Sequence, residues 1–157
     1  MKRPIVVALA AAVIAVAVLA GCTSPQSPAA GRKAAAQVQH HIRLVCSEQA
    51  AWDQRGEASV KALYADTGAL SADASASNPA GVTKAGRKLS SDAVAAAILP
   101  LPPVAPGFWK ALTAHYAAAG TAIAAGNMSG AVPELEAGSS AISAFSAAAG
   151  KCPGTNA

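Results

Sequence analysis

The sequence predicts an all-α protein, a four-helix up-down bundle that is rich in alanine and closed by one disulfide. Alanine accounts for 44 of the 157 residues, and it has the highest helix propensity of all residues. The larger apolar residues recur at intervals of three and four positions, which is the period of an amphipathic helix. Proline and glycine gather in a few short segments that separate these periodic stretches. Together these patterns favour helices joined by short connections.

The first helix is predicted over residues 34–74. Val38, Ile42 and Val45 follow a 4-3 spacing, and Trp52 comes seven residues after Val45. Beyond Gly56 the apolar stripe resumes one position later, at positions 60, 63, 67 and 70. A phase shift at a glycine indicates a kink or a locally unwound turn. The segment is therefore either one bent helix or two helices, at 34–55 and 57–75.

The second helix is predicted to begin at Asn78-Pro79 and to extend to about Leu99. Asparagine is a preferred N-cap, and proline is favoured at the first helical position. The apolar stripe of this helix is thin, and Ser90-Ser91-Asp92 offers a second N-cap. Residues 79–90 are thus either ordered helix or a loose connector.

A proline-rich segment at 100–107 follows the second helix and is predicted to be extended. Two interpretations are open. The segment is either a stiff crossover of the bundle, with Leu101 and Val104 packed over Trp109, or a ligand for an aromatic groove on a partner.

The third helix is predicted to begin near Pro106 or Phe108 and to stop at Gly126-Asn127. The fourth is predicted to be capped by Ser129 and to reach Cys152. Short connections make consecutive helices antiparallel neighbours, which gives the up-down topology. Because alanine buries little area, the larger side chains are expected to dominate the core. These are Trp52, Leu63, Tyr64, Trp109, Leu112, Tyr116, Ile142 and Phe145.

Cys46 and Cys152 are predicted to form a disulfide. They lie near the ends of the first and last helices, which an up-down bundle brings together. The bond would close a loop of about 105 residues, and such a cross-link contributes about 4–5 kcal/mol in the chain-entropy model. The two cysteines have no Cys-x-x-Cys spacing that would indicate a metal site.

The N-terminus has the layout of a secretory signal, with Lys2 and Arg3 before an apolar stretch that is too short for an ordinary membrane-spanning helix. The stretch ends in Leu19-Ala20-Gly21-Cys22, which resembles the lipobox of bacterial lipoproteins. The resemblance implies cleavage after Gly21 and acylation of the Cys22 thiol. It predicts a protein anchored by lipid to the cell membrane and facing the extracytoplasmic side. Residues 1–21 would then be the signal, 22–33 a flexible tether, 34–153 the bundle and 154–157 a tail.

The charge balance argues against nucleic acid as a partner. The formal net charge of +4 includes Lys2 and Arg3, and the chain after the signal carries only +2, evenly spread. Lys84, Arg87 and Lys88 form a small basic face, which is interpreted as solvated rather than as a lipid-binding site.

The sequence contains no pattern typical of an enzyme or of a cofactor site. Gly-x-Ser-x-Gly, His-Glu-x-x-His and phosphate-binding glycine loops do not occur. His40 and His41 point about 100° apart on a helix, so they do not chelate a metal together. Glu134 and Glu136 are interpreted as complements of a helix dipole. We therefore expect no catalytic activity, no cofactor and no metal.

By elimination, the sequence predicts a non-enzymatic binding or accessory protein of the cell envelope. Its expected partners are the lipid bilayer, through acylated Cys22, and an envelope protein. The alternative is a carrier that holds a small apolar ligand or a lipid between its helices. The pocket for such a ligand is predicted at Trp52, Trp109, Tyr116 and Phe145.

Overall fold

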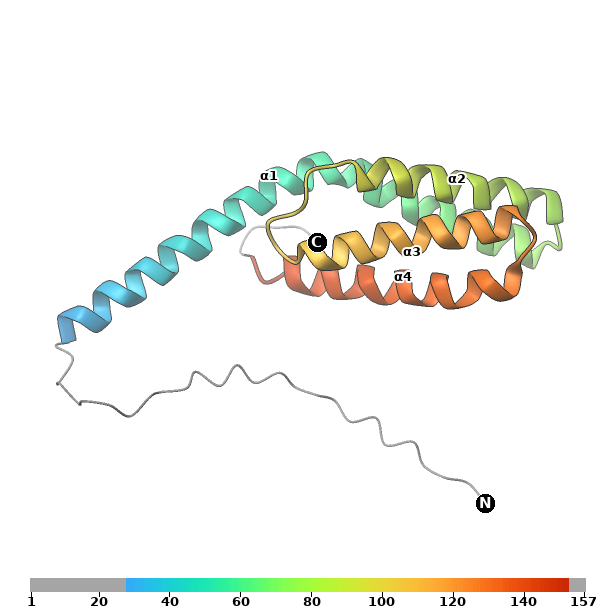
Figure 1. Cartoon of the computed structure of the whole chain (residues 1–157). Helices are drawn as coiled ribbons and strands as arrows, with labels where there is room; N and C mark the ends of the chain where they lie inside the picture. The colour runs from blue at the N-terminus through green and yellow to red at the C-terminus, as the bar shows by residue number, and fades with distance from the viewer. Residues whose placement is uncertain (1–27, 153–157) are drawn as a thin grey trace, which may run out of the picture. The chain divides into compact units, whose positions relative to one another are not determined.

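The structure is a computed structural model that describes residues 28–152, and within these residues it consists of four α-helices without strands. They are α1 (Pro28–Ser75), α2 (Pro79–Ala97), α3 (Pro106–Ala124) and α4 (Met128–Ala149). Residues 37–152 form the bundle, in which α2, α3, α4 and the later part of α1 run side by side (Figure 1). The predicted all-α four-helix fold is confirmed.

Helix α1 differs from its prediction at both its start and its middle. It begins at Pro28, six residues before the predicted start, so residues 28–33 are helical where a flexible tether was expected. Ala29 and Ala30 precede Gly31, and Arg32, Lys33 and Ala34 follow it; all of these are good helix formers, which accounts for the extension. The helix also continues without a break through Gly56. A Cβ atom at Gly56 would lie 2.7 Å from the Trp52 ring, so this glycine makes room for the indole.

The starts of α2 and α4 are set by asparagine caps. The Asn78 side chain accepts a hydrogen bond from the Gly81 amide at 3.0 Å, as predicted, and α2 is continuous helix over 79–90. The Asn127 side chain does the same for the Gly130 amide at 3.0 Å. The prediction that Ser129 caps α4 is wrong, because asparagine occupies the cap two residues earlier. Ser129 instead donates its hydroxyl hydrogen to the Asn127 side chain.

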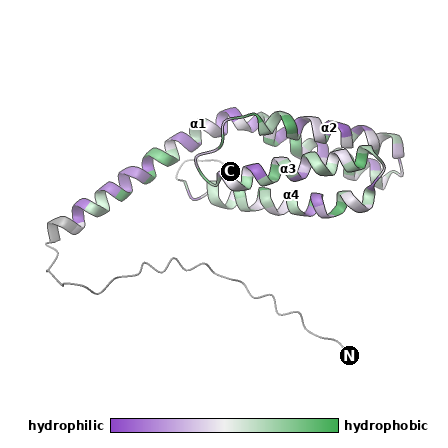
Figure 2. Cartoon of the chain, viewed as in Figure 1, coloured by the Kyte–Doolittle hydropathy of each residue, from purple (hydrophilic) through white to green (hydrophobic). Residues whose placement is uncertain are grey.

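Large apolar side chains fill the centre of the bundle. Hydrophobic and hydrophilic positions alternate along each helix (Figure 2). Seven of the eight residues predicted to dominate the core are buried; the exception is Tyr64, which is 54% exposed. In α1 the buried positions are 49, 52, 56, 63, 66 and 70, and Tyr64 lies one residue, about 100° around the helix, from this stripe. The stripe also begins later than predicted, because Val38 and Ile42 are exposed.

Glycines allow the helix backbones to approach closely at two crossings. A Cβ at Gly120 on α3 would lie 2.5 Å from the backbone oxygen of Gly86 on α2. On the other side of α3, Tyr116 packs against α4 at Gly138, where a Cβ would lie 2.3 Å from the ring. Helices α2, α3 and α4 therefore pack closely at these glycines.

A disulfide joins α1 to the end of α4. The Cys46 and Cys152 sulfurs are bonded, and their Cα atoms lie 5.2 Å apart. The predicted pairing is confirmed. The predicted lipidation site Cys22, the signal and the tail 154–157 lie outside the described residues. Among the described helices, none combines the length and apolar character needed to cross a membrane.

Candidate functional site

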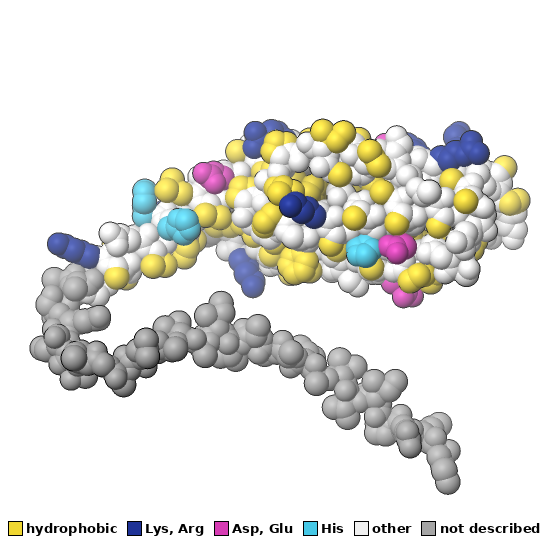
Figure 3. Space-filling model, viewed as in Figure 1, with side chains coloured by type: hydrophobic (Ala, Val, Ile, Leu, Met, Phe, Trp, Pro, Cys, Tyr) yellow, Lys and Arg dark blue, Asp and Glu magenta, His cyan; other side chains and the backbone are white. Residues whose placement is uncertain are grey.

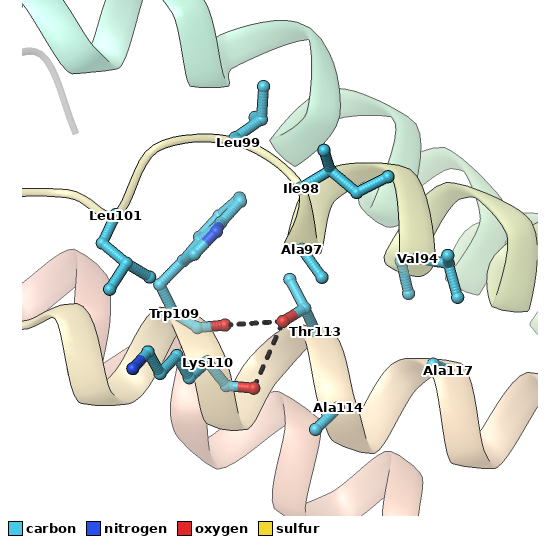
Figure 4. A pocket seen from close by; sticks show the side chains of 11 residues that line it. Val94, Ala97, Ile98, Leu99, Leu101, Trp109, Lys110, Thr113, Ala114 and Ala117 are labelled. Carbon is cyan, nitrogen blue, oxygen red and sulfur yellow. Dashed lines mark hydrogen bonds between the residues drawn. The ribbon is translucent and has the colours of Figure 1, made fainter.

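An apolar groove of about 540 Å³ lies between the C-terminal end of α2 and the N-terminal half of α3 (Figure 4). The segment that connects the two helices closes one end of it. Helix α2 contributes Ala93, Val94 and Ala97; the connection contributes Ile98, Leu99 and Leu101; α3 contributes Trp109, Lys110, Thr113, Ala114 and Ala117. Ligand sites in proteins are commonly hollows of about 300–1,000 Å³ with mainly apolar walls. The groove is therefore of a size suited to a small molecule.

The groove is hollow because small side chains line it. Ala97 on α2 and Ala114 and Ala117 on α3 are all in the lining, and Thr113 lies between Ala97 and the backbone of α3 (Figure 4). Below them the Trp109 indole is fully buried and donates its N–H to the Ala96 carbonyl at 3.3 Å. Trp109 also packs edge-on against Trp52, with ring centroids 4.8 Å apart. The Trp109 indole, which lines the groove, is thus held in place by a hydrogen bond and by packing on Trp52.

The rim of the groove exposes aliphatic side chains to solvent. Ile98 is 80% exposed, Val94 53% and Leu101 43%. A single exposed aliphatic residue is ordinary on a protein surface, whereas several around one hollow are typical of a binding site. In the space-filling view hydrophobic side chains are exposed over the bundle, interspersed with charged groups (Figure 3).

The connection between α2 and α3 is held by side chains of α1. The Trp52 indole donates its N–H to the Pro100 carbonyl. The Val104 amide donates to the side-chain oxygen of Gln49 at 3.0 Å, and Gln49 is itself fully buried. Pro102 is also fully buried. The structure therefore supports the crossover interpretation of the proline-rich segment. Leu101, however, borders the groove instead of being buried over Trp109.

Lys110 carries the only charge in the lining of the groove. Its side chain is exposed, and none of the ion pairs among residues 28–152 involves it. The other polar side chain, Thr113, donates its hydroxyl hydrogen to the carbonyl of Trp109 or Lys110, at 3.1 and 3.2 Å. The lining thus offers an apolar surface and one cation, with no pair of titratable groups for acid–base chemistry.

The pocket predicted at four aromatic residues is not present as an opening. The rings of Trp52, Trp109 and Phe145 pack on one another, with centroids 4.8 to 5.7 Å apart, and fill the core. Tyr116 is buried against Gly138. Close helix approach at alanine and glycine brings these rings into contact. Of the four, only Trp109 lines the groove.

The basic face predicted at Lys84, Arg87 and Lys88 is partly an ion-pair cluster. The Lys88 ammonium lies 2.7 Å from a carboxylate oxygen of Asp66 on α1 and 2.7 Å from one of Asp92. Asp66 is 3% exposed, and burial raises its pKa although the Lys88 hydrogen bond opposes this. Hydrogen bonds to the two aspartates raise the pKa of Lys88, and the bond to Lys88 lowers that of Asp92.

Of the remaining candidate residues, Glu134 has a hydrogen-bonding partner on another helix, whereas His40 and His41 are exposed. Glu134 accepts a hydrogen bond from, or shares a proton with, the His115 ring at 2.7 Å, which links α4 to α3. The two residues lie far apart in sequence, so no local pattern could reveal the pair. Within residues 28–152 no three His, Cys, Asp or Glu side chains are placed to hold a metal ion.

The chain matches no protein-family model, no curated protein and no solved structure. The groove and the lipobox are therefore the features from which a function can be proposed.

Proposed function

We propose that this chain is a lipid-anchored, non-enzymatic binding protein of the bacterial cell envelope, and that its ligand is a small apolar molecule held in the α2–α3 groove. The groove carries the proposal, because it combines a volume of about 540 Å³ with an apolar lining and an exposed aliphatic rim. The lipobox Leu19-Ala20-Gly21-Cys22 supports the anchor. Two or more acyl chains on Cys22 would hold the protein stably at a bilayer.

Two substitutions on α3 test the groove. Ala114 is exposed and lines it, so Ala114→Leu fills the hollow without touching the core. Ala118 is exposed one turn further along α3 and is outside the lining, which makes Ala118→Leu the matched control. Alkyl-chain ligands should change the tryptophan fluorescence of the wild type and of Ala118→Leu, and Ala114→Leu should bind them at least tenfold more weakly. Equal binding by all three proteins would contradict the proposal.

The anchor has a separate test. Cys22→Ala should abolish incorporation of radiolabelled palmitate and leave the uncleaved precursor in the cell. If Cys22→Ala is processed and labelled like the wild type, the lipoprotein assignment is wrong. The binding test does not depend on this result.

A further inference from the structure

The positive charge of Lys110 indicates which class of apolar ligand fits the groove. Lys110, Ala114 and Ala117 follow one another along one side of α3. Seven residues of helix span about 10 Å, so the single cation marks one end of a groove whose remaining length is apolar. In Figure 4 the Lys110 ammonium lies at the same end of the view as Leu101, away from Ala117. An occupant complementary to this arrangement has an anionic group at one end and a hydrocarbon chain behind it.

We infer that the groove binds a single-chain anionic amphiphile, with its carboxylate or other acidic head at Lys110 and its alkyl chain running between α2 and α3 toward Ala117. This inference rests on the proposed function, because it names the ligand of the same groove. The chain packs on the alanines that form the hollow and is flanked by Val94 and Ile98. The head stays at the surface beside an exposed ammonium.

The size of the groove favours an alkyl chain over a segment of a partner protein. An α-helix with its side chains is about 10 Å across, so a volume of about 540 Å³ accommodates roughly five helical residues. That is little more than one turn. A stable protein–protein interface buries about 800 Å² on each partner, which needs a far longer contact. A single hydrocarbon chain, in contrast, needs only a narrow hollow of the size seen here.

Among the side chains of the lining, Lys110 is the only one that offers hydrogen-bond donors not already engaged within the described residues. The Thr113 hydroxyl is engaged with backbone carbonyls of its own helix. A ligand with polar groups along its length would therefore lose hydrogen bonds to water without replacement. A polar group is tolerated only at the Lys110 end, which is what distinguishes an amphiphile from a polar small molecule.

The test compares decanoate, decan-1-ol and decyltrimethylammonium at submicellar concentrations. Because the core contacts described lie between residues 46 and 152, the polypeptide of residues 23–157 without its acyl group contains the whole bundle. Isothermal titration calorimetry at low ionic strength should show decanoate binding about two- to fivefold more tightly than decanol, as expected for an exposed charge pair. Decyltrimethylammonium should bind most weakly, and added salt should reduce the differences.

Lys110→Gln should lower the affinity for decanoate to that for decanol and leave decanol unchanged. Lys84→Gln makes the same charge change and is the matched control, because Lys84 is exposed on α2 and lies outside the groove. Lengthening the chain should tighten binding about two- to fourfold per methylene, until the chain outgrows the groove.

The possible outcomes test the anionic-amphiphile inference and the proposed binding function separately. Equal affinities for the three decyl compounds, unchanged in Lys110→Gln but lost in Ala114→Leu, would overturn the inference and keep the groove as a binding site. Binding to acidic vesicles without binding to monomeric decanoate would overturn it in favour of a membrane surface. If no decyl compound binds and Ala114→Leu behaves like wild type, the proposed function itself fails.

Discussion

Removing the disulfide should cost this domain a large part of its stability. Cys46 and Cys152 are 106 residues apart, and closing a loop of that length lowers the entropy of the unfolded chain by an amount worth about 4.7 kcal/mol. Single domains are typically stable by about 5–15 kcal/mol in total. The double variant Cys46→Ala/Cys152→Ala should therefore lose about 4–5 kcal/mol, which corresponds to roughly 15–20 °C in Tm for a domain of this size.

Urea unfolding of the 23–157 polypeptide, followed by circular dichroism and tryptophan fluorescence, measures this loss. The m-value should rise in the variant, because an unfolded chain without the cross-link exposes more surface. Dithiothreitol should destabilise the wild type by the same amount and should leave the double variant unchanged, which controls for packing at the two positions. A loss below about 1 kcal/mol would refute the argument that loop closure is a main source of stability.

Three further substitutions test the helix contacts and the buried carboxylate. Gly120→Ala should destabilise the fold by about 1–3 kcal/mol, because the new methyl meets the backbone of α2. Gly68→Ala, where a Cβ meets nothing within 4 Å, should stabilise it by about 0.5–1 kcal/mol; thermal melts of the two variants should shift in opposite directions. Because burial raises the folded-state pKa of Asp66, its protonated form favours folding at low pH, and this contribution is lost as pH rises through that pKa. The stability of wild type relative to Asp66→Asn should therefore fall as the pH rises above about 3.9, the ordinary pKa of an aspartate, and a relative stability that increases with pH above this value would contradict the assigned direction of the shift.

The parts of the fold that depend on local chemistry could be predicted from the sequence. Asn78-Pro79 defines a helix start with its own side chains and needs no tertiary information. The disulfide followed from topology, because an up-down bundle brings the ends carrying Cys46 and Cys152 together. Tyr64 shows the limit of this reasoning. A stripe that shifts by one residue moves a side chain by about 100°, and only the packed neighbours decide which of two adjacent residues is buried.

The groove could not be predicted, because it results from missing side-chain volume. Sequence reasoning looks for a pocket where large aromatic residues gather, and here those rings fill the space between the helices. The hollow lies instead along a lining that includes Ala93, Ala97, Ala114 and Ala117, and alanine is so common in this chain that its positions carry no signal. The pairing of Asp66 with Lys88 was equally hidden, since 22 residues separate them.

The contact of Gly86 with Gly120 assigns different tasks to the two ends of the α2–α3 pair. At that end the backbones touch, and any added side chain forces them apart. At the other end the Trp109 indole packs between the two helices. The other residues that line the groove there are small or exposed. Substitutions at the open end consequently change what the groove accepts without disturbing the crossing that fixes the helix pair. Under the proposed function, surface substitutions at the open end would alter the ligand preference and leave this crossing of α2 and α3 in place.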